Sequence, residues 1–262
     1  MSSFTDAKRV VIKVGSSTLT YPSGGMNLRL IENLVRVLAD LKNSGKEVIF
    51  VSSGAIAAGV GRLGMKERPK DIPGKQAAAS VGQTELMYLY DKCFAEYNHP
   101  VGQVLLTNDV IGDAGRRQHV HNTFERLLEL GVIPIVNEND TVAVDEIKIG
   151  DNDTLSAVVA RITGADALVI LSDIDGLFTA NPATTSDAKL IPLVDKIDDE
   201  LFAIAGGAGS SRGTGGMQTK LSAASLAGEA GIVTAIINGK NPALLYSLFE
   251  GESVGTRFEL KG

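Results

Sequence analysis

The sequence has one cysteine, three histidines and no tryptophan among its 262 residues. A single cysteine, Cys93, excludes an internal disulfide and a multi-cysteine zinc site, and it fits a protein of the reducing cytoplasm. His119 and His121 lie two positions apart in a helical pattern, so they face different sides of the helix. We therefore assign no metal ligand, and lysine, acidic and amide side chains become the candidates for chemistry.

Long hydrophobic runs are also lacking. No uncharged apolar stretch reaches 18 residues, about the length that a membrane-spanning helix needs. The N-terminus carries charges before its first apolar run, unlike a signal peptide. The net charge is −6, with 31 acidic and 25 basic residues, which is the wrong sign for a nucleic-acid-binding protein. We expect neither a membrane nor a nucleic acid as partner.

Short apolar runs alternate with helical patterns along the chain. Continuous hydrophobicity is typical of strands that are buried on both faces, and it predicts strands at 10–14, 47–51, 101–106, 132–136, 167–171 and 233–237. Three amphipathic patterns between them end where a glycine caps a helix, at Gly45, Gly131 and Gly231. The repeated order of strand, helix, glycine and strand predicts an α/β fold with a mostly parallel sheet.

Two segments depart from this alternation. The charged, alternating residues 142–149 predict a surface β-hairpin, and residues 206–216, with many glycines, predict a flexible loop that leads into a helix. No linker or internal repeat divides the chain. We predict a single domain, 1–262, with an N-terminal lobe at about 1–163 and a C-terminal lobe at about 164–262.

Three loops combine glycine with hydroxyl side chains where a strand ends or a helix begins: 13–17, 52–55 and 214–220. One such loop alone is best explained as a tight turn. Three in one α/β chain favour binding of phosphate or carboxylate by backbone N–H groups, and Lys13 and Lys220 add positive charge. P-loop, dinucleotide and nucleophile-elbow motifs are absent, which disfavours the commonest nucleotide-binding and hydrolase classes.

The densest polar cluster lies between residues 137 and 154. Asp145 and Glu146 fit a solvated hairpin tip, and Asp153 taken alone fits a helix N-cap. The two Asn- and Asp-rich segments 137–140 and 151–153 nevertheless follow a strand and open a helix. Asn and Asp side chains supply donors and acceptors at fixed geometry, so the cluster favours a polar, amino-bearing substrate.

Several motifs together resemble the amino acid kinase family over essentially the whole chain. They are Lys13-Val-Gly-Ser-Ser and the segments 51–59, 137–142, 147–156, 171–177 and 213–220. The match is strongest to the members that make proline's first precursor by phosphorylating the γ-carboxylate of L-glutamate. The resemblance implies an α/β/α sandwich around a mostly parallel central sheet, an ATP-dependent kinase of that specificity, and Mg²⁺ bound to the nucleotide.

The resemblance also implies residue roles. Lys13 and Lys220 would flank the transferred phosphoryl group, and Asp153 would orient both lysines. The residues implied to bind glutamate are Ser53, Gly54, Asp140, Asp151 and Asn152. Those implied to bind the nucleotide are Lys13, Gly15, Ser172, Asp173, Thr214, Gly215, Gly216, Met217, Gln218, Thr219 and Lys220.

Further properties follow only from the resemblance. It implies a homo-oligomer, a dimer or tetramer, and feedback inhibition by proline. Ser172-Asp173 stands where many members have Thr-Asp, and we expect no C-terminal PUA domain of the kind that many bacterial members carry. Two alternatives stay open: a kinase for another acceptor, such as acetylglutamate or a small phosphate, and a non-catalytic sensor. A sensor is expected to have lost a lysine or Asp153, and all three residues are present.

Overall fold

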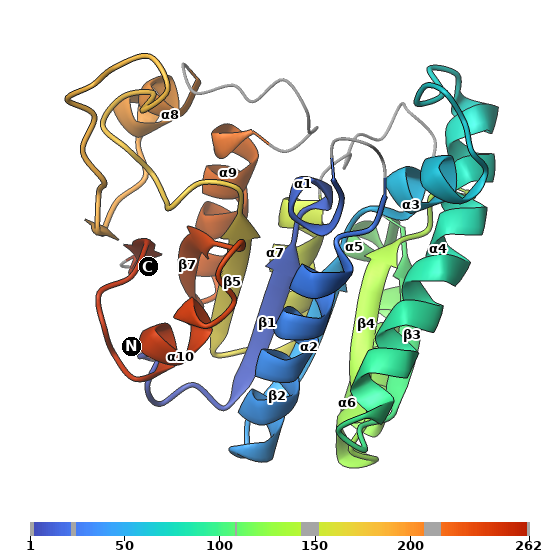
Figure 1. The fold of residues 1–262 in the computed structure, drawn as a ribbon. Coiled ribbons are helices and arrows are strands. Elements are labelled where there is room, and N and C mark those ends of the chain that lie inside the picture. The colour runs from blue at the N-terminus through green and yellow to red at the C-terminus, as the bar shows by residue number, and fades with distance from the viewer. Residues whose placement is uncertain (1–2, 22–24, 108, 143–151, 207–215, 261–262) are drawn as a thin grey trace.

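The computed structural model describes residues 3–21, 25–107, 109–142, 152–206 and 216–260 (Figure 1). In this part of the chain eight strands form one sheet, in the order β3-β4-β2-β1-β5-β7-β8-β6. Every neighbouring pair is parallel except β7 and β8. The strands are β1 Arg9–Val14, β2 Glu47–Ser52, β3 Val101–Leu106, β4 Ile133–Glu138, β5 Ala167–Ser172, β6 Leu193–Val194, β7 Val233–Asn238 and β8 Thr256–Phe258.

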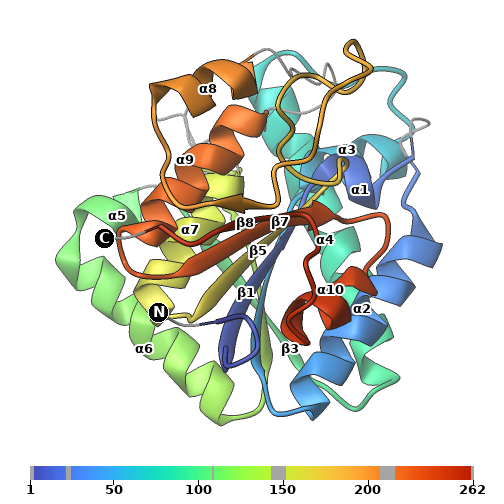
Figure 2. The same ribbon diagram turned by 90° about the vertical axis from the view of Figure 1, so that its left-hand side faces the viewer.

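Helices cover both faces of the sheet, as the view in Figure 2 shows. Helices α2, α4 and α10 pack on one face, and α6, α7 and α9 pack on the other. This arrangement is the α/β/α sandwich that the family resemblance implies. The helices are α1 Ser16–Leu19, α2 Leu28–Asn43, α3 Ala55–Arg62, α4 Ile72–Ala95, α5 Asp109–Gly112, α6 Ala114–Glu129, α7 Asn152–Thr163, α8 Asp199–Gly206, α9 Met217–Gly228 and α10 Leu244–Phe249.

Strand β1 shows how side chains divide between the two layers. Successive side chains of a strand point to opposite faces. Val10, Ile12 and Val14 therefore join the hydrophobic layer beneath α2 and α10, while Val11 joins the layer beneath α7 and α9. Lys13 has the parity of Val11. The alternation thus directs the lysine toward the side of the sheet that carries α7 and α9.

The predicted strands are confirmed to within one or two residues, and the predicted helix ends are confirmed as well. Gly45, Gly131 and Gly231 follow α2, α6 and α9 with φ of 97°, 74° and 74°, a left-handed conformation that favours glycine. The sequence missed β6, which has only two residues. The predicted hairpin lies outside the described residues except for Val142, which is in a turn, and most of the predicted loop 206–216 lies outside them too.

Helix α4 contributes large side chains to the core and carries the single cysteine. Its residues Leu86, Tyr90 and Phe94 are buried in the core, while Cys93 is half-buried. None of the helices in the described ranges is both long enough and apolar enough to cross a bilayer.

Candidate active site

A charged cluster lies where β1 ends and where α7 and α9 begin. We use this name for Lys13, Asp153 and Lys220. Asp153 is completely buried, and the two lysines are 4% and 7% exposed. Lys13 Nζ lies 2.5 Å from Asp153 Oδ1, and Lys220 Nζ lies 2.9 Å from Oδ2. The three charged groups, far apart in the sequence, therefore form one continuous set.

The local structure explains why these side chains meet. Lys13 comes from the buried central strand β1, and Asp153 and Lys220 come from the first turns of α7 and α9, which pack side by side on the same face of the sheet (Figure 1). Thr219 Oγ1 adds a hydrogen bond of 3.1 Å to Asp153 Oδ2. Both helices direct the positive ends of their dipoles toward this point.

The electrostatics of the cluster favour an anion. Burial alone raises the pKa of the Asp153 carboxyl, but the ammonium groups of Lys13 and Lys220 outweigh burial and hold the pKa well below its ordinary value. Asp153 is therefore ionised at neutral pH. The two lysines exceed it by one positive charge, and the helix ends add further positive potential. A phosphoryl group that carries negative oxygens is complementary to such a site.

A second set of polar groups adjoins the charged cluster through Asn152, the neighbour of Asp153. Asn152 Nδ2 donates to Ser53 Oγ at 2.8 Å, to Asn137 Oδ1 at 2.9 Å and to the Ser52 carbonyl at 3.2 Å. Ser53 follows β2 and Asn137 belongs to the end of β4. The structure thus brings the predicted residues Ser53 and Asn152 into direct contact.

Gly54 and Gly15 end the loops that follow β2 and β1. Gly54 is the N-cap of α3 with φ of 100°, which a residue with a side chain adopts only at a cost. Gly15 caps the short helix α1 with an ordinary φ of −82°. A Cβ atom at Gly15 would lie 3.7 Å from Lys13 Nζ. The two glycines keep the backbone free of side chains next to Ser53 and Lys13.

Two carboxyl groups form what we call the acidic pair: Glu138, the last residue of β4, and Asp140, two positions later. Both are half-buried. Burial, and then the charge of Asp140, raise the pKa of Glu138 to about 7. Burial raises the pKa of Asp140 to about 6 even though Arg68 opposes the shift. The acidic pair therefore gains stability from a cation placed beside it.

Apart from Lys13 and Gly15, the predicted nucleotide-binding residues that the structure describes lie at the end of β5 and at the start of α9. Ser172 is buried at the end of β5, and its hydroxyl donates to Asp173 Oδ1 at 3.3 Å. Gly216 is the N-cap of α9, Met217 is buried and Gln218 is exposed. The predicted residues Asp151, Thr214 and Gly215 lie outside the described residues.

Asn137 and Glu138 belong to the polar segment 137–140 that the sequence assigns to substrate binding as a group, but neither residue was predicted individually, and Gln83 was not predicted at all. Asn137 Nδ2 donates to Gln83 Oε1 at 2.9 Å. Gln83 lies on α4, 54 residues earlier in the chain, and no pattern around it signals this contact. Asn137 itself carried a signal, because a buried amide at the end of a parallel strand needs a partner.

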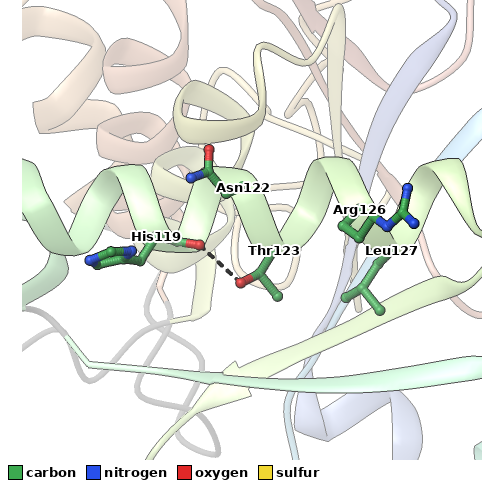
Figure 3. Close-up of a pocket in the computed structure, with 5 residues that line it drawn as sticks. All are labelled: His119, Asn122, Thr123, Arg126 and Leu127. Carbon is green, nitrogen blue, oxygen red and sulfur yellow. Dashed lines mark hydrogen bonds between the residues drawn. The ribbon is translucent and has the colours of Figure 1, made fainter.

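Two further observations concern possible binding sites outside the charged cluster and its neighbours. An open depression on the surface of α6, lined by His119, Asn122, Thr123, Arg126 and Leu127, is drawn in Figure 3. It contains no predicted site residue, and its side chains all come from a single helix. In the described ranges, no group of three or more His, Cys, Asp or Glu side chains is arranged to hold a metal ion.

Comparisons with known proteins agree with the geometry. Residues 8–238 match the model of the amino acid kinase family. The glutamate 5-kinase of Clostridium perfringens (strain 13 / Type A) is 53% identical over 260 residues, which cover 98% of this chain and 97% of that protein. The glutamate 5-kinase of Listeria innocua serovar 6a is 55% identical over 263 residues, which cover 99% and 95%.

Solved structures of low sequence identity share the fold. The isopentenyl phosphate kinase of T. acidophilum, in a product complex, has a TM-score of 0.66 at 17% identity and covers 96% of this chain and 100% of its own. The UMP kinase of Bacillus anthracis has a TM-score of 0.64 at 18% identity, with coverage of 97% and 96%. The family model matches most of this chain, and both relatives are more than 50% identical to it along nearly its whole length. This chain therefore belongs to the amino acid kinase family.

Proposed function

We propose that this protein transfers the γ-phosphoryl group of ATP to the γ-carboxylate of L-glutamate. The observation that carries the proposal is the buried charged cluster at the carboxyl end of a parallel strand. It offers two ammonium groups, held by one carboxylate, to a phosphoryl group. Full-length relatives named glutamate 5-kinase, at 53% and 55% identity, support the choice of acceptor.

The proposed reaction is a single displacement at phosphorus. One γ-carboxylate oxygen of glutamate forms a bond to the γ-phosphorus of ATP, and the bond from that phosphorus to the bridging oxygen of the β-phosphate breaks. The products are glutamyl 5-phosphate and ADP. A free carboxylate with a pKa of about 4.3 is already deprotonated at pH 7, so the acceptor needs no general base.

Catalysis then depends on position and charge, as in other phosphoryl transfers. Lys13 and Lys220 would stabilise the negative charge on the transferred group from two sides. Asp153 would fix the direction of both ammonium groups, because each of its oxygens is paired with a different lysine. Pre-organised charges of this kind need no rearrangement at the moment of reaction.

Residue assignments follow the same division. We assign glutamate binding to the N-terminal part, about 1–163, and nucleotide binding to the C-terminal part, about 164–262. The acceptor residues are Ser53, Gly54, Asp140, Asp151 and Asn152. The nucleotide residues are Lys13, Gly15, Ser172, Asp173 and 214–220.

Magnesium fits this arrangement as an ion bound to the nucleotide. Mg²⁺ keeps several waters and needs few protein ligands when phosphate oxygens are available. The described residues provide no set of three acidic or imidazole ligands, so phosphate oxygens and water would supply most of its coordination. When bound, the ion would neutralise charge on the phosphates.

Assembly and regulation are further parts of the proposal. We propose a homo-oligomer, a dimer or tetramer, which a native mass measurement would test. We also propose feedback inhibition by proline through overlap with the glutamate site. Activity titrated with proline at several glutamate concentrations would then show competitive inhibition.

Release of ADP tests the main proposal. The protein is incubated with ATP, Mg²⁺ and one acceptor at a time: L-glutamate, acetylglutamate, aspartate, carbamate or UMP. We expect a rate well above background with glutamate and the highest kcat/KM for it. A higher kcat/KM for another acceptor would favour the alternative specificity. No rate with any acceptor, together with intact binding of ATP or an amino acid, would favour the non-catalytic sensor.

A further inference from the structure

A continuous row of hydrogen-bonded amide groups leads from the edge of the sheet to Ser53 and Gly54, the loop between β2 and α3, which we call the acceptor loop. We call this row the amide chain. From Gln103 on β3 it runs through Gln83 on α4, Asn137 on β4 and Asn152 on α7 to the hydroxyl of Ser53. Its hydrogen bonds measure 3.1, 2.9, 2.9 and 2.8 Å.

Backbone groups fix the orientation of the two central amides. The N–H of Glu138 can only donate, and it donates to Asn137 Oδ1 at 2.9 Å. The carbonyl of Ser52 can only accept, and it accepts from Asn152 Nδ2 at 3.2 Å. Because a planar amide has its oxygen and nitrogen on opposite sides, Asn137 must direct its NH₂ group away from Asn152.

The NH₂ group of Asn137 therefore needs an acceptor on the side of α4. Gln83 Oε1 provides it, and Gln83 Nε2 in turn donates to Gln103 Oε1. Asn137 is only 3% exposed, so without Gln83 its NH₂ group would be left buried and unbonded, which is costly. A turn of the Asn137 amide would not help, because two NH₂ groups would then face each other at Asn152.

The packing of α4 against α3 fixes the position of Gln83 relative to the acceptor loop. Gly82, its neighbour, lies so close to α3 that a Cβ atom there would be 1.8 Å from the Ala55 carbonyl oxygen. Helix α3 begins with Ala55, directly after Ser53 and Gly54. The close contact of the two helices ties the position of Gln83 to that of the loop.

We propose that Gln83 is a positioning residue for the acceptor site, and this inference rests on the proposed function. By accepting from Asn137, Gln83 holds the Asn137 oxygen toward Asn152, and Asn152 then donates to Ser53 Oγ. The Ser53 oxygen is thereby used as an acceptor, which leaves its O–H hydrogen to donate to a carboxylate oxygen of the substrate. Gln83 acts through this chain without touching the substrate.

The test compares Gln83→Leu with Gln83→Glu in the full chain. Leucine has a similar size but accepts no hydrogen bond, whereas an ionised glutamate side chain still accepts from Asn137. At about pH 8 we expect Gln83→Leu to raise the KM for glutamate roughly tenfold, the loss typical of one buried hydrogen bond. The KM for ATP and kcat should stay within about twofold, and Gln83→Glu should restore the glutamate KM to within about threefold of wild type.

A matched control is Gln118→Leu on α6. Gln118 Nε2 donates to Asn122 Oδ1 at 2.8 Å on the exposed surface, so the same chemical change removes a similar amide contact that is not part of the amide chain and lies on another helix. We expect no change in KM from it. Gln103→Leu, at an exposed position of β3, removes only the outer link and should raise the glutamate KM about twofold.

Each other outcome is decisive. A Gln83→Leu enzyme with unchanged glutamate KM would overturn the role of Gln83 while the proposed function stands. If Gln83→Leu raised both KM values and lowered kcat to a similar extent, and Gln83→Glu did not restore them, Gln83 would be a merely structural residue. That result would overturn the proposal. A wild-type protein without glutamate-dependent ADP release would refute the proposed function and this inference with it. If Gln83→Leu does not fold, as judged by circular dichroism, an unchanged KM in Gln103→Leu together with a failing Gln83→Glu enzyme overturns the proposal.

Discussion

The carboxyl group of the charged cluster and the two carboxyl groups of the acidic pair have pKa values shifted in opposite directions. Asp153, completely buried, has a pKa held below its ordinary value, because Lys13 and Lys220 each contact one of its oxygens. Glu138 and Asp140 are only half-buried, yet their pKa values are raised to about 7 and about 6. The more deeply buried carboxyl is therefore the stronger acid.

The difference shows that the partners of a buried carboxyl, more than its depth, decide its charge. The charged cluster is complete without a ligand, as expected of a site that is organised in advance for a transition state. Within the residues that the structure describes, the acidic pair has no compensating cation of that strength, and Arg68 alone does not reverse the effect of burial. In the proposed reaction, the ammonium group of glutamate would supply the missing charge.

Removal of one lysine from the charged cluster should give the largest effect. We expect Lys220→Met to lower kcat about 100- to 1000-fold, the loss seen when one stabilising donor to a transition state is removed, with the KM for glutamate changed less than about threefold. Asp153 keeps its contact with Lys13, so the variant should fold. Steady-state kinetics and thermal unfolding measure both points.

The control for this prediction is Lys196→Met. Lys196 is exposed, and its Nζ lies 3.6 Å from an oxygen of Asp198, so the same change removes a surface ion pair of little energetic value. Its kcat should equal that of wild type. If Lys220→Met raised KM and left kcat unchanged, the result would contradict a role of Lys220 in the transition state.

Lys13 and Lys220 were predictable from the glycine-containing loops at a strand end and a helix start, whereas the role of Asp153 between them followed only from the family resemblance, because Asp153 taken alone fits a helix N-cap. The rule that parallel sheets bind ligands at the carboxyl ends of their strands then brings Lys13, Asp153 and Lys220 to the same edge. The fold was predictable for a similar reason. Strands buried on both faces leave continuous apolar runs, and glycines at 45, 131 and 231 mark the helix ends.

The amide chain and the acidic pair were not predictable to the same degree. Gln83 is an ordinary polar residue of a helix, and its importance comes from a contact with Asn137 across 54 positions. The raised pKa values of Glu138 and Asp140 depend on burial by distant elements, which the local sequence does not encode. Strand β6 was missed because two residues are too few for any period.

Titration of the acidic pair should change glutamate affinity by an intermediate amount. Between about pH 5.5 and 8 the two carboxyls lose their protons, and the Kd for glutamate should fall about tenfold, the effect of one pKa unit of interaction energy. The ammonium and carboxylate groups of free glutamate do not titrate in this range. Calorimetry without nucleotide measures the Kd directly and avoids titration of ATP.

The variant Glu138→Gln separates the two members of the acidic pair in this experiment. It should abolish the part of the pH dependence that is centred near pH 7 and leave the part near pH 6, which belongs to Asp140. A Kd that is independent of pH in the wild type would refute the ammonium partner that we infer for the acidic pair.

The smallest effect is expected on stability, where Glu138→Gln should make the protein more stable at high pH. A carboxyl whose pKa is about 7 in the folded chain and about 4.3 when unfolded binds more protons in the native state, so the free energy of unfolding falls as the pH rises through that interval. Glutamine removes this loss. Because Glu138 is half-exposed, we expect a gain of only about 1 kcal/mol at pH 8, or about 2–4 °C in Tm. The gain should shrink at pH 5.5, and a variant that is less stable than wild type at pH 8 would show that the Glu138 carboxylate already has a cationic partner in the free protein.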